Sequence, residues 1–418
     1  MKKAIKIFPK ILEIYTKTNL VVKISIGLII GIILGIFFKH LQIVSMMGDL
    51  FVGALKAIAP VLVFALVSSA LAQGDKKPDQ KFGLVILLYL LSTFLAAVTA
   101  VATSFMFPQT LVLSGAYEAA FVPSGVGAVL KNLLLNMVAN PVDSLVEGKY
   151  LGILFWAIIF GFAMKSVSSE TTKKFLLDCS DGISKIVNWI IEFAPIGIMG
   201  LIYQSVSSSG MSIFKIYGKL IMLLVGTKLT IAFLIVPMLV FICIRKNPYP
   251  LVWYCMVKSG VTAFFVRSSA ANIPVNMAVC EKLRLDKELY SVSIPLGATI
   301  NMNGAAATIA IMTLAAANTV GISVDIPSAL ILSLLGTLAA CGASGVAGGS
   351  LLLIPMACSL FGISPDIAMQ VVAVGFVIGV IQDSFETALN SATDVVFSAT
   401  AEYVQWKKEG KEIVIYND

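Results

Sequence analysis

The first half of the chain alternates long apolar segments with short polar ones. A helix that crosses the hydrocarbon core of a membrane needs about 20 apolar residues, and these segments approach or exceed that length. We therefore predict helices at about 20–39, 47–72, 82–106, 150–166, 183–206 and 216–244. The stretch 107–149 is too polar to span a membrane and is predicted to form loops and short helices on the outer face.

The second half contains two apolar segments that are interrupted at their centres. Pro250–Cys280 carries the polar run Arg267–Asn272, and Ala329–Phe361 carries the glycine-rich run Cys341–Ser350. Such a centre would break a spanning helix, and exposed backbone at membrane depth is tolerated only where protein or a water-filled cavity covers it. Each segment is therefore predicted to form a re-entrant helical hairpin whose tip faces an internal site.

Each predicted hairpin is followed by a long helix that contains polar residues. Ser291–Val320 is predicted to break at Asn301-Met302-Asn303-Gly304, and Pro365–Ala401 carries three acids in its second half. Two units of hairpin and helix, one entering from each side of the membrane, form an inverted repeat, which is the usual architecture of secondary transporters. Paired re-entrant hairpins leave an ion channel open as the alternative.

Composition and charge support a membrane protein. The 418 residues are 58% hydrophobic and 13% charged, so lipid must be the main solvent. The formal net charge of +7 comes from Lys and Arg that cluster in alternate gaps between the predicted helices, which places both termini in the cytoplasm. The basic start leads into a first helix that we expect to be retained. The six cysteines show no metal or disulfide spacing, and no catalytic cluster accompanies the single histidine, His40, so an enzyme is not expected.

The last predicted helix carries the strongest chemical signal. Asp383, Thr387, Asn390 and Asp394 follow the spacing i, i+4, i+7 and i+11, which places them on one face, and Glu386 borders that face. A charge at the bilayer centre costs at least about 2.5–3.5 kcal/mol, so these acids need partners, and cations are the natural ones. The alternative is an ion pair that serves packing, for example between Glu386 and Arg267.

The predicted break supplies complementary ligands. Unwound backbone at Asn301–Gly304 frees carbonyl oxygens, which suit sodium, and one carboxylate such as Asp394 would balance the charge of the ion. A transported amino acid needs an anion for its ammonium group, for which Asp383 is suitable. Its carboxylate suits the free N–H groups at the hairpin tips, where half-helices begin. The glycine-rich run Ser344–Ser350 would also let the second tip move as a gate.

These elements resemble, in the correct order and over nearly the whole chain, the dicarboxylate/amino acid:cation symporters. The resemblance is strongest to their bacterial serine/threonine:sodium symporter branch. It rests on Arg267-Ser268-Ser269, Asn301-Met302-Asn303-Gly304, the glycine-rich second tip and Asp383-x-x-x-Thr387-x-x-Asn390-x-x-x-Asp394. It implies eight transmembrane helices, two re-entrant hairpins, and a homotrimer in which a rigid scaffold supports a transport domain that moves like an elevator.

The resemblance also implies the site residues. Substrate would be bound by Ser268, Ser269, Ala270, Met302, Ala305, Val346, Gly348, Asp383, Glu386, Thr387 and Asn390. Two sodium ions would be held by Gly297, Thr299, Asn301, Met302, Asn390, Asp394 and backbone of the second hairpin. A third, doubtful sodium site would comprise Tyr89, Ser92, Thr93 and Asn303.

Three departures from the family pattern refine this expectation. Glu386 stands where acidic-substrate members carry an Arg, and Ala305 replaces a Thr that helps to bind the same substrate carboxylate. Because Glu386 would repel an acidic side chain, serine and threonine are the expected substrates. Asn303 stands where many members carry an Asp, so fewer than three coupled sodium ions are expected. An acidic-substrate symporter that uses Arg267 as the carboxylate partner, and a proton-coupled symporter that uses Glu386, remain alternatives.

The expected organisation follows from these assignments. The protein would be a multi-pass protein of the cell (inner) membrane with both termini cytoplasmic. The first scaffold helices would occupy 1–70, and a third helix at 71–106 would join the transport domain. The outer-face segment and the remaining helices, mainly scaffold, would occupy 107–245. The core transport domain would occupy 246–405, and a cytoplasmic tail would occupy 406–418.

Overall fold

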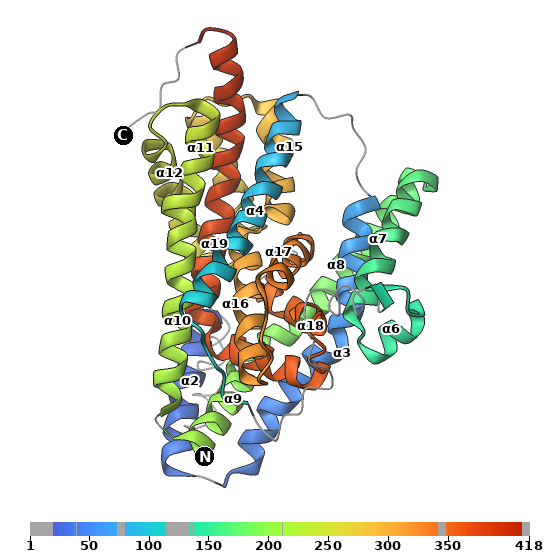
Figure 1. The fold of residues 1–418 in the computed structure, drawn as a ribbon, viewed down its shortest axis with the longest axis vertical. Coiled ribbons are helices and arrows are strands. Elements are labelled where there is room, and N and C mark those ends of the chain that lie inside the picture. Colours follow the sequence, from blue (N-terminus) through green and yellow to red (C-terminus); the bar gives the residue numbers. More distant parts are fainter. Residues whose placement is uncertain are drawn as a thin grey trace, which may run out of the picture.

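The computed structural model describes residues 20–38, 40–72, 80–113, 134–135, 137–210, 212–341 and 348–411. These residues are almost entirely helical and include no strand. The helices of the first part are α2 (Leu20–Phe37), α3 (Gln42–Ala72), α4 (Gln80–Met106), α6 (Pro141–Glu147), α7 (Tyr150–Val167), α8 (Glu170–Glu192) and α9 (Ala194–Ser209). α2 packs against α9, and α3 packs against α7, α8 and α9, so these helices form one layer beside the rest of the molecule (Figure 1).

The segment around α8 differs from the sequence expectation. The predicted helices at 150–166 and 183–206 leave a gap between them, but α8 begins within that gap at Glu170 and meets α9 at a bend of 55°. The Ser169 side chain caps the start of α8 by accepting a hydrogen bond from the Thr172 N–H, and Pro195 lies in the first turn of α9. Of the lysines in and beside this gap, Lys174 and Lys185 are exposed on α8, and Lys173 is buried with Glu170 as an ion-pair partner, so α8 is an amphipathic helix.

A long continuous helix follows. It consists of α10 (Ser212–Thr230), a π-helical turn η1 (Ile231–Ile235) and α11 (Val236–Ile244), which together confirm the predicted helix at 216–244. The π turn lies directly before Pro237, whose missing N–H disturbs the regular hydrogen bonding of a helix. This composite helix packs against α19, α4 and α16 and lies along one edge of the molecule (Figure 1).

At the first predicted hairpin, the structure has two helical legs joined at a tip. One leg consists of α12 (Tyr249–Cys255), η2 (Met256–Gly260) and α13 (Val261–Val266), and the other is α14 (Ile273–Lys282). The legs contact each other through Ser259, which bonds to the side chains of both Asn276 and Asn272. The first leg ends at Arg267, whose φ of 55° is left-handed. Such a conformation is uncommon for a residue other than glycine and marks this tip as a strained position.

The second predicted hairpin has legs α17 (Ile326–Ala340) on one side and η3 (Gly349–Leu353) with α18 (Ile354–Ser359) on the other. Both legs contact α16 and each other. The tip residues 342–347, which include the predicted substrate contact Val346, lie outside the described residues.

Two helices carry most of the predicted site. The predicted break at Asn301–Gly304 is present but shorter than expected: α15 (Lys287–Ile300) and α16 (Asn303–Thr319) are separated only by Asn301 and Met302. Asn303 and Gly304 begin α16, where the N–H groups of a first turn lack partners within the helix and are free to bind other groups. α19 (Pro365–Lys408) is one continuous helix of 44 residues that runs through the centre of the molecule (Figure 1).

The length and apolar surface of these helices indicate an integral membrane protein. Among the described residues, five helices are long and apolar enough to span a membrane, or six if the bent pair α8–α9 counts as one span. α2 and α7 expose large apolar side chains such as Ile29, Ile33 and Phe162, as expected for surfaces that face lipid.

Candidate functional site

The predicted polar face of α19 lies against the break and the first hairpin tip. Asp383, Thr387, Asn390 and Asp394 are all buried, with at most 6% of each side chain exposed. Their partners come from α4, the first hairpin, α15, α16 and the second hairpin. The structure thus brings together side chains that lie far apart in the sequence.

Both hairpins meet at Asp383. The Arg267 Nε donates a hydrogen bond of 2.8 Å to its Oδ2, and the Gly348 N–H donates one of 3.2 Å to its Oδ1. Each carboxylate oxygen therefore accepts from a different hairpin. The Thr387 hydroxyl donates a hydrogen bond of 2.8 Å to the main-chain carbonyl of Asp383, one turn earlier in α19.

Glu386 has a different partner from the one considered from the sequence. Arg267 is paired with Asp383, whereas the cation beside Glu386 is Lys228, whose Nζ lies 3.6 Å from its Oε2. The same oxygen accepts hydrogen bonds from the Thr308 hydroxyl at 2.6 Å and from the Gln382 amide at 3.3 Å. The proposed Glu386–Arg267 pair is therefore wrong because the hairpin tip directs Arg267 toward Asp383.

Sequence reasoning missed Lys228, Thr308 and Gln382 as members of this cluster. A signal for one of them was present, because Lys228 interrupts the apolar segment predicted at 216–244. An ionisable residue inside a membrane span marks a functional site by default. Thr308 and Gln382 carry no comparable signal, because short polar side chains are common in helices.

Asp394 lies where the broken helix approaches α19. The Asn301 amide donates hydrogen bonds of 2.8 Å to Asp394 Oδ1, 3.2 Å to the Asn390 carbonyl and 2.8 Å to the Thr393 hydroxyl. Gly297 is in direct contact, since a Cβ atom at that position would lie 2.6 Å from Asp394 Oδ1. The carboxylate thus accepts amide N–H groups from Asn301 and, at 3.4 Å, from Asn276. The Asp394 carboxylate and the nearby Asn390 carbonyl are of the oxygen type that hard cations prefer.

Asn390 links α19 to the start of α16. Its Oδ1 accepts the Gly304 N–H at 2.7 Å, and its Nδ2 lies 3.4 Å from the sulfur of Met302. Gly304 is also confined by α19, because a Cβ atom there would lie 2.8 Å from the Glu386 Cα. Met302 and its neighbour Ala305 are almost completely buried.

The predicted third ion site forms a closed hydrogen-bond network on α4. Asn303 Oδ1 accepts from the Ser92 hydroxyl at 2.8 Å and from the Thr93 hydroxyl at 3.3 Å. Its Nδ2 donates to the Thr393 hydroxyl at 3.0 Å. The Tyr89 hydroxyl lies nearby and bonds to the carbonyls of Ser293 and Asp394 at 3.2 and 3.1 Å.

Some predicted residues lie apart from this cluster. Thr299 is exposed, and its hydroxyl donates to the Leu296 carbonyl at 2.7 Å within α15. At the first tip, Ala270 is exposed, Ser269 is buried, and the Ser268 hydroxyl accepts the Ala271 N–H at 3.2 Å. The tip therefore presents mixed polar and apolar groups next to Arg267.

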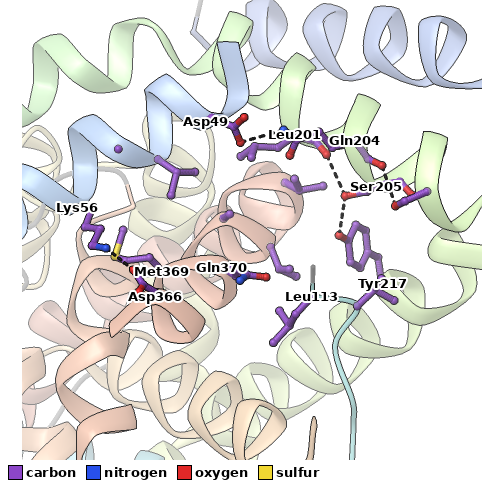
Figure 2. Close-up of a pocket in the computed structure, with 17 residues that line it drawn as sticks. Asp49, Lys56, Leu113, Leu201, Gln204, Ser205, Tyr217, Asp366, Met369 and Gln370 are labelled. Carbon is purple, nitrogen blue, oxygen red and sulfur yellow. Dashed lines mark hydrogen bonds and ion pairs between the residues drawn. The ribbon is translucent and has the colours of Figure 1, made fainter. Parts of the chain in front are cut away.

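A cavity that the sequence did not predict lies between the layer of first-part helices and α19. Its volume is about 770 Å³, and its wall includes residues of α3, α9 and α10 and the first third of α19. Figure 2 shows the ion pair between Lys56 and Asp366 at one side and Ser205 with Tyr217 at the other. None of the predicted site residues lines it. It separates the two parts of the molecule rather than holding the polar cluster.

A sequence model of the sodium:dicarboxylate symporter family matches residues 20–403. The chain belongs to this family. The match includes both hairpins, the break at Asn301–Met302 and the polar face of α19, so the whole cluster described above lies within the family's own domain.

Several relatives are named as serine/threonine transporter SstT. The protein with this name from Bifidobacterium adolescentis is 58% identical over 413 residues, which cover 99% of this chain and 96% of the relative. Those of Streptococcus agalactiae and Streptococcus thermophilus are 55% and 52% identical, over 94% and 96% of this chain and 98% and 99% of the relatives. The relatives are thus transporters, and the chain is similar to them over nearly its full length.

Proposed function

We propose that this protein is a sodium-coupled symporter that imports serine and threonine by alternating access. Family membership and the names of relatives that are more than half identical support this function. The observation that carries it is the convergence of both hairpins on Asp383, next to a second buried carboxylate at a broken helix. This arrangement offers one acid to a substrate and another to an ion.

The substrate ammonium would bind Asp383. For this to happen, the Arg267 guanidinium must leave Asp383. The substrate ammonium then replaces the guanidinium at the same carboxylate, so the local charge changes little. The substrate carboxylate would bind the Asn390 amide and the first hairpin tip at Ser268, Ser269 and Ala270, with Thr387 assisting. Gly348 and, beyond the described residues, Val346 would close over the substrate from the second hairpin.

One sodium ion would bind Asp394 together with oxygens of Gly297, Asn301 and Asn390. The contact of Gly297 with the Asp394 carboxylate supports this grouping, since it brings backbone of α15 to the acid. A second ion would lie between Thr299, Met302 and the second hairpin. The last residues of α15 would have to rotate for Thr299 to reach this ion, because its side chain is exposed and its hydroxyl bonds within its own helix.

The third family ion site would be weak or absent. Asn303 satisfies Ser92 and Thr93 with its amide oxygen and contributes no negative charge. A cation there, next to Tyr89, would have to displace these hydrogen bonds without a carboxylate to compensate. We therefore propose fewer than three sodium ions for each substrate.

The substrate side chain would lie at Glu386 and Ala305. Glu386 is buried against Gly304, the residue that precedes Ala305 in α16, and Ala305 is buried as well. A negative charge there disfavours aspartate and glutamate, because like charges in a desolvated contact cost several kcal/mol. It would also accept the hydrogen bond of a serine or threonine hydroxyl.

The proposed architecture has eight transmembrane helices and two re-entrant hairpins. Adding the shorter apolar helices α2 and α7 to the six candidate spans gives this count. The packing of α4 against α15, α16 and α19, and the ion pairs of Lys81 with Asp286 and Glu402, support its place in the transport domain. α10 and α11 also pack on α19, so we assign them to the transport domain and restrict the scaffold to α2, α3 and α6–α9.

The proposed assembly rests on the family, and the proposed orientation rests on the distribution of Lys and Arg between the helices. We propose a homotrimer in the cell (inner) membrane, with both termini in the cytoplasm and the scaffold layer between subunits. The transport domain would then move past that layer along the seam that contains the 770 Å³ cavity.

Counterflow in proteoliposomes tests the proposed specificity. Vesicles loaded with unlabelled serine, threonine, alanine or aspartate would be diluted into labelled serine in the presence of sodium. Internal serine and threonine should drive accumulation of label, and aspartate should not. Accumulation driven as strongly by aspartate as by serine would contradict the proposed substrate class.

A further inference from the structure

Lys228 is a buried cation that neither the family resemblance nor the sequence motifs assign to the site. Its side chain lies on α10 and is 1% exposed. Its Nζ donates hydrogen bonds of 2.9 Å to the main-chain carbonyl and 3.1 Å to the side-chain oxygen of Gln382. It lies 3.6 Å from Glu386. A charge at this depth is costly and indicates a functional role.

The charges around the proposed substrate site are balanced. Asp383 is paired with Arg267, and Glu386 with Lys228, so this cluster contains two acids and two bases. A neutral amino acid can enter such a cluster without adding net charge. Aspartate would bring one further carboxylate and place it beside Glu386.

The groups around Glu386 form a carboxylate-binding site that the protein fills with its own side chain. Glu386 Oε2 is surrounded by a hydroxyl from Thr308, an amide from Gln382 and the ammonium of Lys228. These three donors come from α16, α19 and α10. Such donors, with a cation among them, would recognise any carboxylate in the same place.

We propose that Lys228 is a specificity-determining residue, a cation that Glu386 masks. While Glu386 occupies the three donors, acidic substrates are excluded. Once the Glu386 carboxylate is removed, Lys228, Thr308 and Gln382 bind the side-chain carboxylate of an acidic amino acid. This inference rests on the proposed function, in which Glu386 lies beside the substrate side chain.

The test is competition by aspartate for sodium-driven serine uptake in proteoliposomes. Glu386→Ala should lower the half-inhibitory concentration of aspartate at least roughly tenfold, because a repulsive contact is replaced by an attractive one. The gain should disappear in Lys228→Met/Glu386→Ala and persist in Lys228→Arg/Glu386→Ala. Lys219→Met/Glu386→Ala is the matched control, since Lys219 is an exposed lysine on the same helix.

Glu386→Gln provides a second variant if Glu386→Ala does not fold, because its amide oxygen still gives Lys228 a partner. The neutral amide neither repels a carboxylate nor compensates the charge of Lys228, so aspartate should inhibit this variant more strongly than the wild type, though less than Glu386→Ala, and the gain should depend on Lys228. A wild-type protein that does not take up serine would refute the proposed function itself. If the wild type transports serine, the inference is overturned either by Glu386 variants that stay insensitive to aspartate or by a gain that survives Lys228→Met.

Discussion

Single residues at the centre of this protein bind to groups from distant parts of the chain. Asp383 accepts from both hairpins, and Asn303 connects α16 to α4 and α19. Breaking a buried ion pair by removing one partner costs about 3–5 kcal/mol, so Asp383, which is paired with Arg267, affects stability as well as binding. Asn303 differs from its neighbours because it satisfies its partners without a charge.

Asn303→Asp tests whether this missing charge limits the number of coupled ions. The new carboxylate would face the Ser92 and Thr93 hydroxyls and would also face Asn301 Oδ1, which now accepts from the Asn303 amide at 3.3 Å. A cation is needed to bring these oxygens together. We expect a higher sodium-to-serine ratio, and a melting temperature that rises more steeply with sodium than that of the wild type.

Asn318→Asp is the matched control, since Asn318 is exposed at the other end of α16 and undergoes the same change. Equal ratios and equal sodium dependence in all three proteins would show that the charge at position 303 does not set the ion count.

At the scale of elements, the sequence predicted those features that depend on the local order of polar and apolar residues. The break before α16, the first hairpin tip at Arg267 and the polar face of α19 were visible because polar residues interrupt apolar segments. The start of α8 was missed, since average polarity does not distinguish an amphipathic helix from a loop. The pairing of Lys228 with α19 could not be predicted, because its partner Gln382 lies 154 residues away.

Gly297→Ala tests the contact between α15 and α19 that would hold an ion. A Cβ atom there would lie 2.6 Å from Asp394 Oδ1 and 2.9 Å from the Tyr89 hydroxyl, so the two helices must separate. Such overpacking costs about 1–3 kcal/mol. We expect the sodium concentration that gives half-maximal serine uptake to rise roughly five- to hundredfold.

Gly218→Ala is its control, because no atom lies within 4 Å of a Cβ at that position of α10. If both variants are folded and show the same sodium dependence as the wild type, Gly297 does not belong to an ion site.

At the scale of the whole molecule, two parts meet along a seam. The layer of α2, α3 and α6–α9 faces a core that is formed by α4, α10, α11, the hairpins, α15, α16 and α19. The cavity of about 770 Å³ lies on this seam, and the exposed ion pair of Lys56 with Asp366 crosses it. Exposed ion pairs contribute only about 0–1 kcal/mol, so this one can open during movement at little cost.

Cross-linking across the seam tests whether the core moves past the layer. Cysteines at positions 56 and 366, in a background without reactive native cysteines, would be joined by a short bifunctional thiol reagent. We expect the cross-linked protein to bind serine, measured by thermal stabilisation, but to lose sodium-driven uptake. The same cysteines without the reagent serve as the control. Full transport after complete cross-linking would rule out elevator movement at this seam.

The most direct test of the central claim is serine uptake by the purified protein in liposomes under an imposed sodium gradient. Labelled serine should accumulate above its external concentration when sodium is high outside, and the accumulation should collapse when sodium is equal on both sides. An imposed proton gradient without sodium should produce no accumulation. Uptake that follows the proton gradient, or flux that neither saturates with serine nor responds to sodium, would contradict a sodium-coupled serine symporter.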